Sequence, residues 1–327
     1  MASPRLVVSA LTKRSLSPRA ASNFCNTSGR HSLSPRAPDK HLRVQNVGTN
    51  RALPFSIDTP NRKRIINNGL QDEEKSVLGT GSFGTVYKAS YKGDQVAVKI
   101  IKRRKLSDAE VEAEKRASIL RHPNIVRVLG IEQGSVWSMI TMELCDTSLQ
   151  NKLEKMRLTR NERIEMWRAI GSALNYCHMI GIIHADIKPK NILIASNGQP
   201  KLADFGSSIV IGEESKALLG SRGTPGYVAP EVVKGSFPSI KSDIYSLGVL
   251  AWQLLVRKAP YAGCHPHTIL YLTGKGVRPF DNQPDKYIDD ECHNEYKSLY
   301  KKLCSVNADN RPKLDIIIDQ LNFLQNN

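Results

Sequence analysis

The spacing of hydrophobic and polar residues divides the chain into a region without periodicity, a region of short strands and a region of helices. Residues 1–70 show no regular spacing of apolar positions and are rich in Ser, Pro, Arg and Asn. Runs rich in apolar and β-branched residues then predict strands at 76–79, 85–90, 95–101, 125–129 and 138–144. Apolar positions at helical spacing predict helices at 107–120, 160–181, 241–256 and 296–303.

Strands followed by helices indicate an α+β fold in two lobes. We expect a β-rich N-terminal lobe at about residues 73–144 and a helical C-terminal lobe at about residues 145–327. Residues 1–72 are expected to be a disordered basic tail, because so polar a segment cannot bury enough apolar surface to fold.

The positive charge of the chain is concentrated in this tail. The whole chain carries a net charge of +16, and residues 1–70 hold twelve Lys or Arg against Asp39 and Asp58, a net charge of +10. A basic arm can bind nucleic acid or acidic lipid. However, Phe24 and Phe55 are the only aromatic residues among residues 1–70, so no nucleic-acid partner is expected.

The tail also contains short sequences typical of linear motifs. The hexapeptide Ser-Leu-Ser-Pro-Arg-Ala occurs at residues 15–20 and 32–37, and two copies are too few for a repeat fold. Four hydroxyl residues precede a proline and are candidate regulatory phosphorylation sites: Ser3, Ser17, Ser34 and Thr59. Chance occurrence in a Ser/Pro-rich tract is the alternative.

The six cysteines are scattered and include no pair with CxxC spacing, so a zinc site is not expected. Scattered cysteines in a domain of this size favour reduced thiols and a cytoplasmic location. The most apolar stretch, residues 244–256, is too short to span a bilayer. We expect a cytoplasmic monomer without a membrane partner.

A glycine-rich segment follows the first predicted strand. Glycines let the backbone approach phosphate groups without a side-chain clash. A dinucleotide-binding loop would lead directly into a helix, whereas this segment leads into a second predicted strand. We expect a hairpin that covers the phosphates of a nucleotide, formed by Leu78, Gly79, Thr80, Gly81, Ser82, Phe83, Gly84 and Val86. The alternative is a flexible turn.

Lys99 lies near the centre of a predicted apolar strand. Burying its ammonium group is costly unless the charge is paired, and the expected partners are the phosphates of ATP and a glutamate of the next helix. Glu110, Glu112 and Glu114 are candidates, and we select Glu114 because it lies eight residues before His122. The alternative is a lysine that extends to solvent.

The strongest chemical signal is the segment HADIKPKN at residues 184–191. The carboxylate of Asp186 can accept or orient the proton of a substrate hydroxyl, and Lys188 can hold the γ-phosphate. Asn191 and Asp204 can supply oxygen ligands to Mg²⁺. Thr224 is expected near Asp186, where it would favour an aliphatic hydroxyl over a phenol.

Other residues are expected to bind adenine or to support the site. Met142 should limit the depth of the adenine pocket, with Glu143 and Cys145 offering backbone groups. Three apolar residues should sandwich the ring: Val86, Ala97 and Leu193. Two contacts are expected to be structural, an ion pair between Glu231 and Arg311 and a contact from Asp243 to the backbone of residues 184–191.

In this order and spacing, the motifs are similar to those of the eukaryotic protein kinase superfamily over about residues 73–324. Within it, the chain resembles the Mos family of Ser/Thr kinases at residues 1–4, 121–128, 259–263, 267–271 and 277–279. The resemblance implies a bilobal kinase fold, ATP and Mg²⁺ as cofactors, and a MAP kinase kinase as the protein substrate, phosphorylated during oocyte meiosis.

Two other interpretations remain open, a Raf-like kinase of another branch and a pseudokinase scaffold. The presence of Lys99, Asp186, Asn191 and Asp204 favours an active enzyme. Ala185 occupies the position where most kinases carry an arginine that binds a phosphorylated activation loop. We therefore expect that activity does not depend on phosphorylation of that loop.

Overall fold

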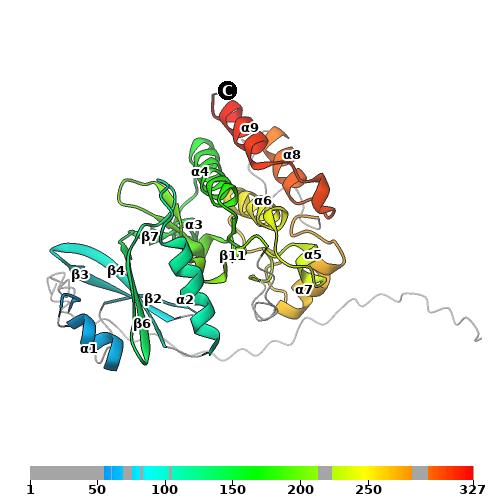
Figure 1. Cartoon of the computed structure of the whole chain (residues 1–327). Coiled ribbons are helices and arrows are strands. Elements are labelled where there is room, and N and C mark those ends of the chain that lie inside the picture. The colour runs from blue at the N-terminus through cyan, green and yellow to red at the C-terminus, as the bar shows by residue number, and fades with distance from the viewer. Residues whose placement is uncertain are drawn as a thin grey trace, which may run out of the picture. The chain divides into compact units, whose positions relative to one another are not determined.

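The computed structural model describes residues 55–59, 61–68, 76–81, 84–102, 105–212, 223–281 and 294–326, without the side chains of residues 68 and 105–110 (Figure 1). Several residues singled out above lie outside this description: Ser3, Ser17, Ser34, Ser82 and Phe83. Thr59 is described and lies exposed in the connection between the first strand and the first helix.

The first half of the described chain is built on a six-stranded sheet with the order β1-β3-β4-β6-β5, in which β2 pairs with β3. The strands are β1 (Phe55–Ser56), β2 (Val77–Gly81), β3 (Gly84–Tyr91), β4 (Asp94–Lys102), β5 (Val128–Gln133) and β6 (Trp137–Glu143). Strands β2 to β6 are paired antiparallel, and β1 runs parallel to β3. The strand expected at 125–129 begins only at Val128, because Ile125 forms a bridge with Leu202 of the other lobe.

Ordered structure begins before residue 73, where it was expected to start. Strand β1 and helix α1 (Asn61–Asn68) precede that point, so the stretch expected to be a tail includes folded residues. Ile57 and Ile65 pack into one core with alternate residues of β4. Their own neighbours in sequence are mostly polar, so the local pattern did not reveal this burial.

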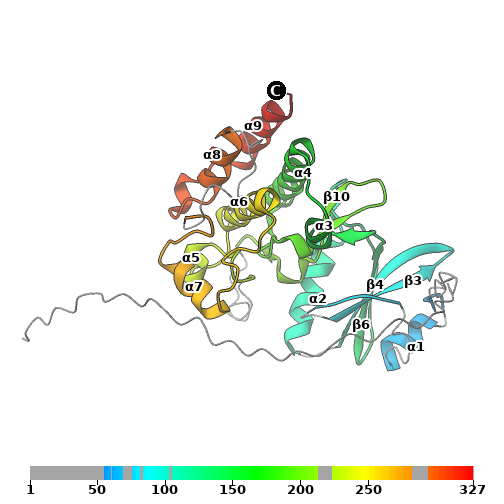
Figure 2. The ribbon, with the colours of Figure 1, turned by 180° about the vertical axis from the view of Figure 1, so that it is seen from behind.

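Helix α2 (Lys105–Ala117) corresponds to the helix predicted at 107–120. Its Val111 packs with Ile101 and Ile140, which belong to the opposite face of the sheet from the core around Ile57. Figures 1 and 2 show α1 and α2 on opposite sides of β4 and β6. Residues 96–101 of β4 are buried on both faces, and all of them except Lys99 are apolar.

The second half is helical, as predicted, with α6 at its centre. Its helices are α3 (Leu149–Lys155), α4 (Arg160–Met179), α5 (Pro230–Val233), α6 (Ile240–Val256), α7 (Pro266–Gly274), α8 (Asn294–Leu303) and α9 (Leu314–Asn326). Trp167 of α4 and Trp252 of α6 are fully buried in one large core. Capping boxes at Thr159 and Ser239 satisfy the first N–H groups of α4 and α6.

Five short strands belong to this half of the chain. The first lies directly before α3, and the other four lie between α4 and α5. The five are β7 (Thr147–Ser148), β8 (Ile182–Ile183), β9 (Ile192–Ile194), β10 (Pro200–Leu202) and β11 (Ile209–Val210). β9 pairs with β7 and β10, and β8 pairs with β11, which fixes the ends of the segment at 184–191. Among the helices of the described residues, none is long and apolar enough to cross a membrane.

Candidate active site

The segment at 184–191 is held at its start by a buried carboxylate. Asp243 of α6 accepts hydrogen bonds from the backbone N–H groups of His184 and Ala185, both at 2.9 Å. The same carboxylate lies 2.9 Å from Nε2 of His178 in α4. The expected contact from Asp243 is therefore present, and it ties the segment to the two central helices.

Asp186 is the centre of a closed polar network. Its Oδ2 accepts hydrogen bonds from Lys188 Nζ at 2.5 Å and from Asn191 Nδ2 at 2.9 Å. Thr224 Oγ1 donates to Asp186 Oδ1 at 2.7 Å and accepts from Lys188 Nζ at 2.7 Å. Thr224 is 38 residues from Asp186 in sequence, so the fold brings together side chains that the motifs alone placed only by expectation.

Lys99 forms a second cluster with two carboxylates. Its Nζ lies 2.9 Å from Glu114 Oε1 and 2.7 Å from Asp204 Oδ1. Burial opposes the charged form of Lys99, but these two carboxylates outweigh that effect and raise the pKa of Lys99. Burial likewise opposes ionisation of Asp204, but the charge of Lys99 holds the pKa of Asp204 below its usual value. The pair is therefore ionised at neutral pH.

Asp204 directly precedes the short helix η3 (Phe205–Ser207). Asp204 adopts a left-handed backbone conformation with φ of 63°, which directs the chain sharply away from β10. Phe205 packs edge-on against His184 with ring centroids 4.8 Å apart. The N–H of Ala203 also donates to the carbonyl of Asn191 at 2.8 Å. These contacts join the segment of Asp204 to that of Asp186.

The described residues expected around the nucleotide lie on β2, β3, β4, β6 and β9, except Cys145, which lies between β6 and β7. Val86 pairs with Lys99, and Ala97 pairs with Met142. Gly84 has a φ of 152°, and a Cβ there would lie 2.3 Å from the carbonyl oxygen of Ile100. Only glycine fits this close approach of β3 to β4, so Gly84 has a structural role besides the expected contact with phosphate.

Glu143 has contacts that the sequence did not predict. Its N–H donates to the carbonyl of Arg127 at 3.0 Å, so that group is not available to a purine base. Its side chain pairs with Lys201 of β10 at 3.0 Å, which links the two lobes. Burial and the charge of Glu143 raise the pKa of the nearby Cys145 to about 11, so this thiol is protonated at neutral pH.

The described residues fit a small, hard cation only in part, as is usual for Mg²⁺. No group of three or more His, Cys, Asp or Glu side chains with metal-ligand geometry occurs among them. Asn191 donates from its Nδ2 group to the backbone carbonyl and the carboxylate of Asp186, and its amide oxygen is an acceptor. Together with the carboxylate of Asp204, it could supply two oxygen ligands to Mg²⁺, an ion that usually takes the rest of its shell from phosphate and water.

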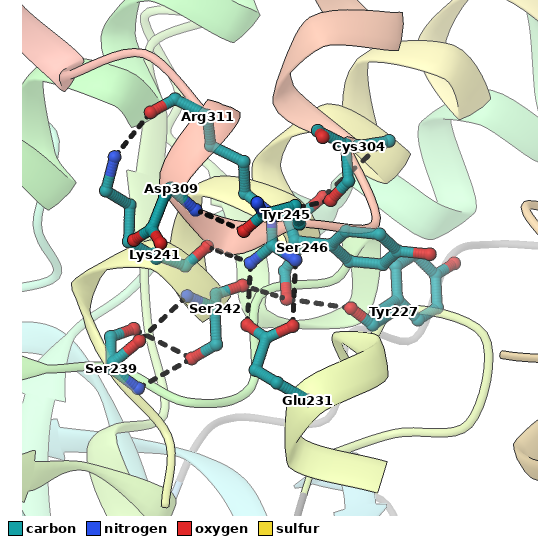
Figure 3. A network of polar contacts seen from close by, with 12 residues as sticks. Tyr227, Glu231, Ser239, Lys241, Ser242, Tyr245, Ser246, Cys304, Asp309 and Arg311 are labelled. Atoms are coloured by element: carbon teal, nitrogen blue, oxygen red, sulfur yellow. Dashed lines mark hydrogen bonds and ion pairs between the residues drawn. The ribbon is translucent and has the colours of Figure 1, made fainter. Parts of the chain in front are cut away.

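The far end of the segment that carries Thr224 is anchored by Arg311. Its guanidinium donates to both oxygens of Glu231, from Nη1 at 2.6 Å and from Nη2 at 2.8 Å. It also donates to the carbonyls of Lys241 and Ser305 and lies over the ring of Tyr245. Figure 3 shows this network, and it contains the ion pair expected between Glu231 and Arg311.

Arg311→Lys should lower the free energy of unfolding by about 3 kcal/mol, because a lysine cannot reproduce the two parallel hydrogen bonds to a partly buried carboxylate. Chemical denaturation measures the change. Arg127→Lys, at an exposed position, is the matched control and should unfold like the parent. A stability of Arg311→Lys equal to that of the control would contradict the structural role of this ion pair.

Comparisons with known proteins agree with this geometry. A model of the protein kinase domain family matches residues 73–322. The serine/threonine-protein kinase mos of Patiria pectinifera is 37% identical over 219 residues, which cover 62% of this chain and 62% of that protein. The dual specificity protein kinase shkD of Dictyostelium discoideum is 34% identical over 260 residues, which cover 75% of this chain and 34% of that protein.

A third relative is the mitogen-activated protein kinase kinase kinase dlk-1 of Caenorhabditis briggsae, 32% identical over 242 residues, which cover 73% of this chain and 27% of that protein. The chain thus spans less than two thirds of the length of each of these relatives. The chain belongs to the protein kinase family, since residues 73–322 match the protein kinase domain.

Proposed function

We propose that this protein transfers the γ-phosphate of ATP to serine or threonine hydroxyls of another protein. The observation that carries the proposal is the network in which Asp186 contacts Lys188, Asn191 and Thr224. In the reaction, the substrate oxygen forms a bond to the γ-phosphorus of ATP. The bond between the γ-phosphorus and the oxygen of the β-phosphate breaks, so that ADP leaves, and Asp186 takes the hydroxyl proton. Lys188 then stabilises the negative charge on the phosphoryl oxygens.

The cluster of Lys99, Glu114 and Asp204 would bind the nucleotide and its metal ion. Lys99, fixed by Glu114, would bind the α- and β-phosphates, and Asn191 and Asp204 would hold Mg²⁺. When bound, the ion would neutralise part of the negative charge of the phosphates. Leu78, Val86, Ala97, Met142 and Leu193 would surround the adenine ring, with the carbonyl of Glu143 and backbone groups of Cys145 facing its edge.

We further propose that the substrate is a MAP kinase kinase. The similar proteins include two named as mitogen-activated protein kinase kinase kinases, dlk-1 and the kinase 13-B of Xenopus laevis, besides mos of Patiria pectinifera. The likeness to Mos favours a role in oocyte meiosis and a cytoplasmic location. The alternative is a kinase of a Raf-like or other branch with a different substrate.

The substrate proposal is tested with the purified full chain, ATP and Mg²⁺, offered two proteins at equal concentration. One is a MAP kinase kinase made inactive by mutation, and the other is an unrelated protein rich in Ser and Thr. We expect serine phosphorylation of the first at a rate at least about tenfold higher than of the second. Equal labelling of both would contradict the MAP kinase kinase assignment while leaving the kinase activity in place.

A further inference from the structure

Residues 55–68 lie outside the region that the kinase family model matches, which begins at residue 73, but they are part of the sheet. Phe55 and Ser56 of β1 pair with Ala89 and Ser90 of β3. The side chains of Ile57 and Ile65 are 0% and 3% exposed. The outer face of the sheet is therefore covered by residues that are not part of the common kinase domain.

Arg62 of α1 contacts three different strands with one side chain. It forms an ion pair with Glu132 of β5 and donates from Nη2 to Thr141 Oγ1 of β6 at 3.5 Å. Its guanidinium carbon also lies 4.5 Å from the centre of the Tyr91 ring of β3. Arg62 is only 7% exposed, and a buried cation needs such partners to offset the loss of hydration.

Two of the strands that Arg62 contacts, β3 and β6, also carry residues expected to bind ATP. Thr141 pairs with Val98 of β4, and both belong to the covered outer face. The neighbouring pairs in the same ladder are Lys99 with Ile140 and Ala97 with Met142. Side chains alternate between the two faces of a strand, so the neighbours of Thr141 on β6 face the nucleotide side. Because these neighbours share one backbone with Thr141, a shift of Thr141 also moves the residues expected to bind ATP.

A close backbone approach at the other end of α1 supports the same arrangement. A Cβ on Gly134, which follows β5, would lie 2.3 Å from the carbonyl oxygen of Ile66 and 2.8 Å from its Cβ. Real Cβ contacts are essentially never this short, and the nearest atom is backbone. Helix α1 therefore lies directly against the connection between β5 and β6, without room for a side chain there.

We propose that residues 55–68 form a strap that holds β3, β4, β5 and β6 in the arrangement that ATP binding requires, with Arg62 as its positioning residue. ATP binding does not depend on the identity of the protein substrate, so the strap can be tested whether or not the MAP kinase kinase assignment holds. Loss of the strap should weaken nucleotide binding more than it slows turnover at saturating ATP.

The test compares Arg62→Met with Arg64→Met in the full chain, since Arg64 is an exposed arginine of the same helix. The readouts are the Kd for ADP by calorimetry, KM for ATP and kcat with a general protein substrate, and hydrogen exchange of residues 55–68. Arg62→Met should raise Kd and KM about tenfold, change kcat by less than about twofold, and release α1. Arg64→Met should leave all four values unchanged.

Gly134→Ala provides a second variant that removes no charge and should displace α1 by steric contact alone. It should raise Kd for ADP in the same way, and it decides the question if Arg62→Met does not fold. A variant in which residues 55–68 exchange freely while Kd for ADP stays within about twofold of the parent would overturn the strap. Unchanged protection of α1 in Arg62→Met would overturn the role of Arg62.

Discussion

Asp186→Asn is expected to lower kcat for protein phosphorylation by about 10²–10⁴-fold, the range for removal of a general base. Asparagine keeps the shape of the side chain and can still contact Thr224 and Lys188, but it cannot take a proton at neutral pH. The contacts of Lys99 with Glu114 and Asp204 do not involve Asp186. The Kd for ADP should therefore stay within about twofold of the parent value.

Kinetics at saturating ATP and calorimetry with ADP separate these two effects. Asp94→Asn is the matched control, because Asp94 is exposed in the hairpin between β3 and β4, and it should keep the parent kcat. If Asp186→Asn retained more than about a tenth of the parent kcat, the assignment of Asp186 as the base would be wrong.

Lys99→Met should have a large effect on stability as well as on activity. Removing the ammonium leaves Glu114, which is 4% exposed, without its partner and Asp204 with one fewer cation. Breaking a buried pair by removing one member costs about 3–5 kcal/mol. We therefore expect a lower free energy of unfolding by about that amount, together with loss of measurable phosphorylation.

The double variant Lys99→Met with Glu114→Gln isolates the cause. It should recover part of the lost stability, because the carboxylate of Glu114 is then no longer left unpaired beside the new apolar side chain, but it should recover no activity. Denaturation curves of the parent, both single variants and the double variant give the coupling energy. A coupling energy near zero would contradict the paired arrangement of Lys99 and Glu114.

The pH dependence of this stability difference follows from the two pKa directions. The pKa of Asp204 is lowered, so its contribution is present above the usual aspartate pKa and is lost as the pH falls through the lowered value. The pKa of Lys99 is raised, so its contribution is present below the usual lysine pKa and is lost only in strong alkali. The gap between parent and Lys99→Met should thus be constant near neutral pH and shrink in acid.

The sequence predicted the parts of the site that lie within single short segments. The spacing within residues 184–191 placed Asp186, Lys188 and Asn191 together, and all three are in contact through Asp186. The choice of Glu114 among three glutamates agrees with its contact to Lys99. Contacts within residues 184–191 follow from the geometry of one loop. The contacts of Glu114 with Lys99 and of Arg311 with Glu231 join separate segments and were expected from the order and spacing of the motifs.

The contacts that the sequence did not reveal are those in which at least one partner belongs to no motif. Nothing near Glu143 indicates its pairing with Lys201, 58 residues away. The burial of Ile65 depends on a sheet face formed by later strands. Helix α9 also was not predicted, and His178 was not expected to contact Asp243. Such contacts follow from the packing of whole elements, which local patterns do not encode.

The central claim is that this chain phosphorylates aliphatic hydroxyls with Asp186 as the base. The most direct measurement incubates the purified chain with γ-labelled ATP and an equimolar mixture of peptides that differ only in a Ser, Thr or Tyr acceptor. We predict label on the Ser and Thr peptides, little on the Tyr peptide, and labelling at least about 100-fold slower with Asp186→Asn. Label on the Tyr peptide at the same rate, or equal labelling by the parent and Asp186→Asn, would contradict the account.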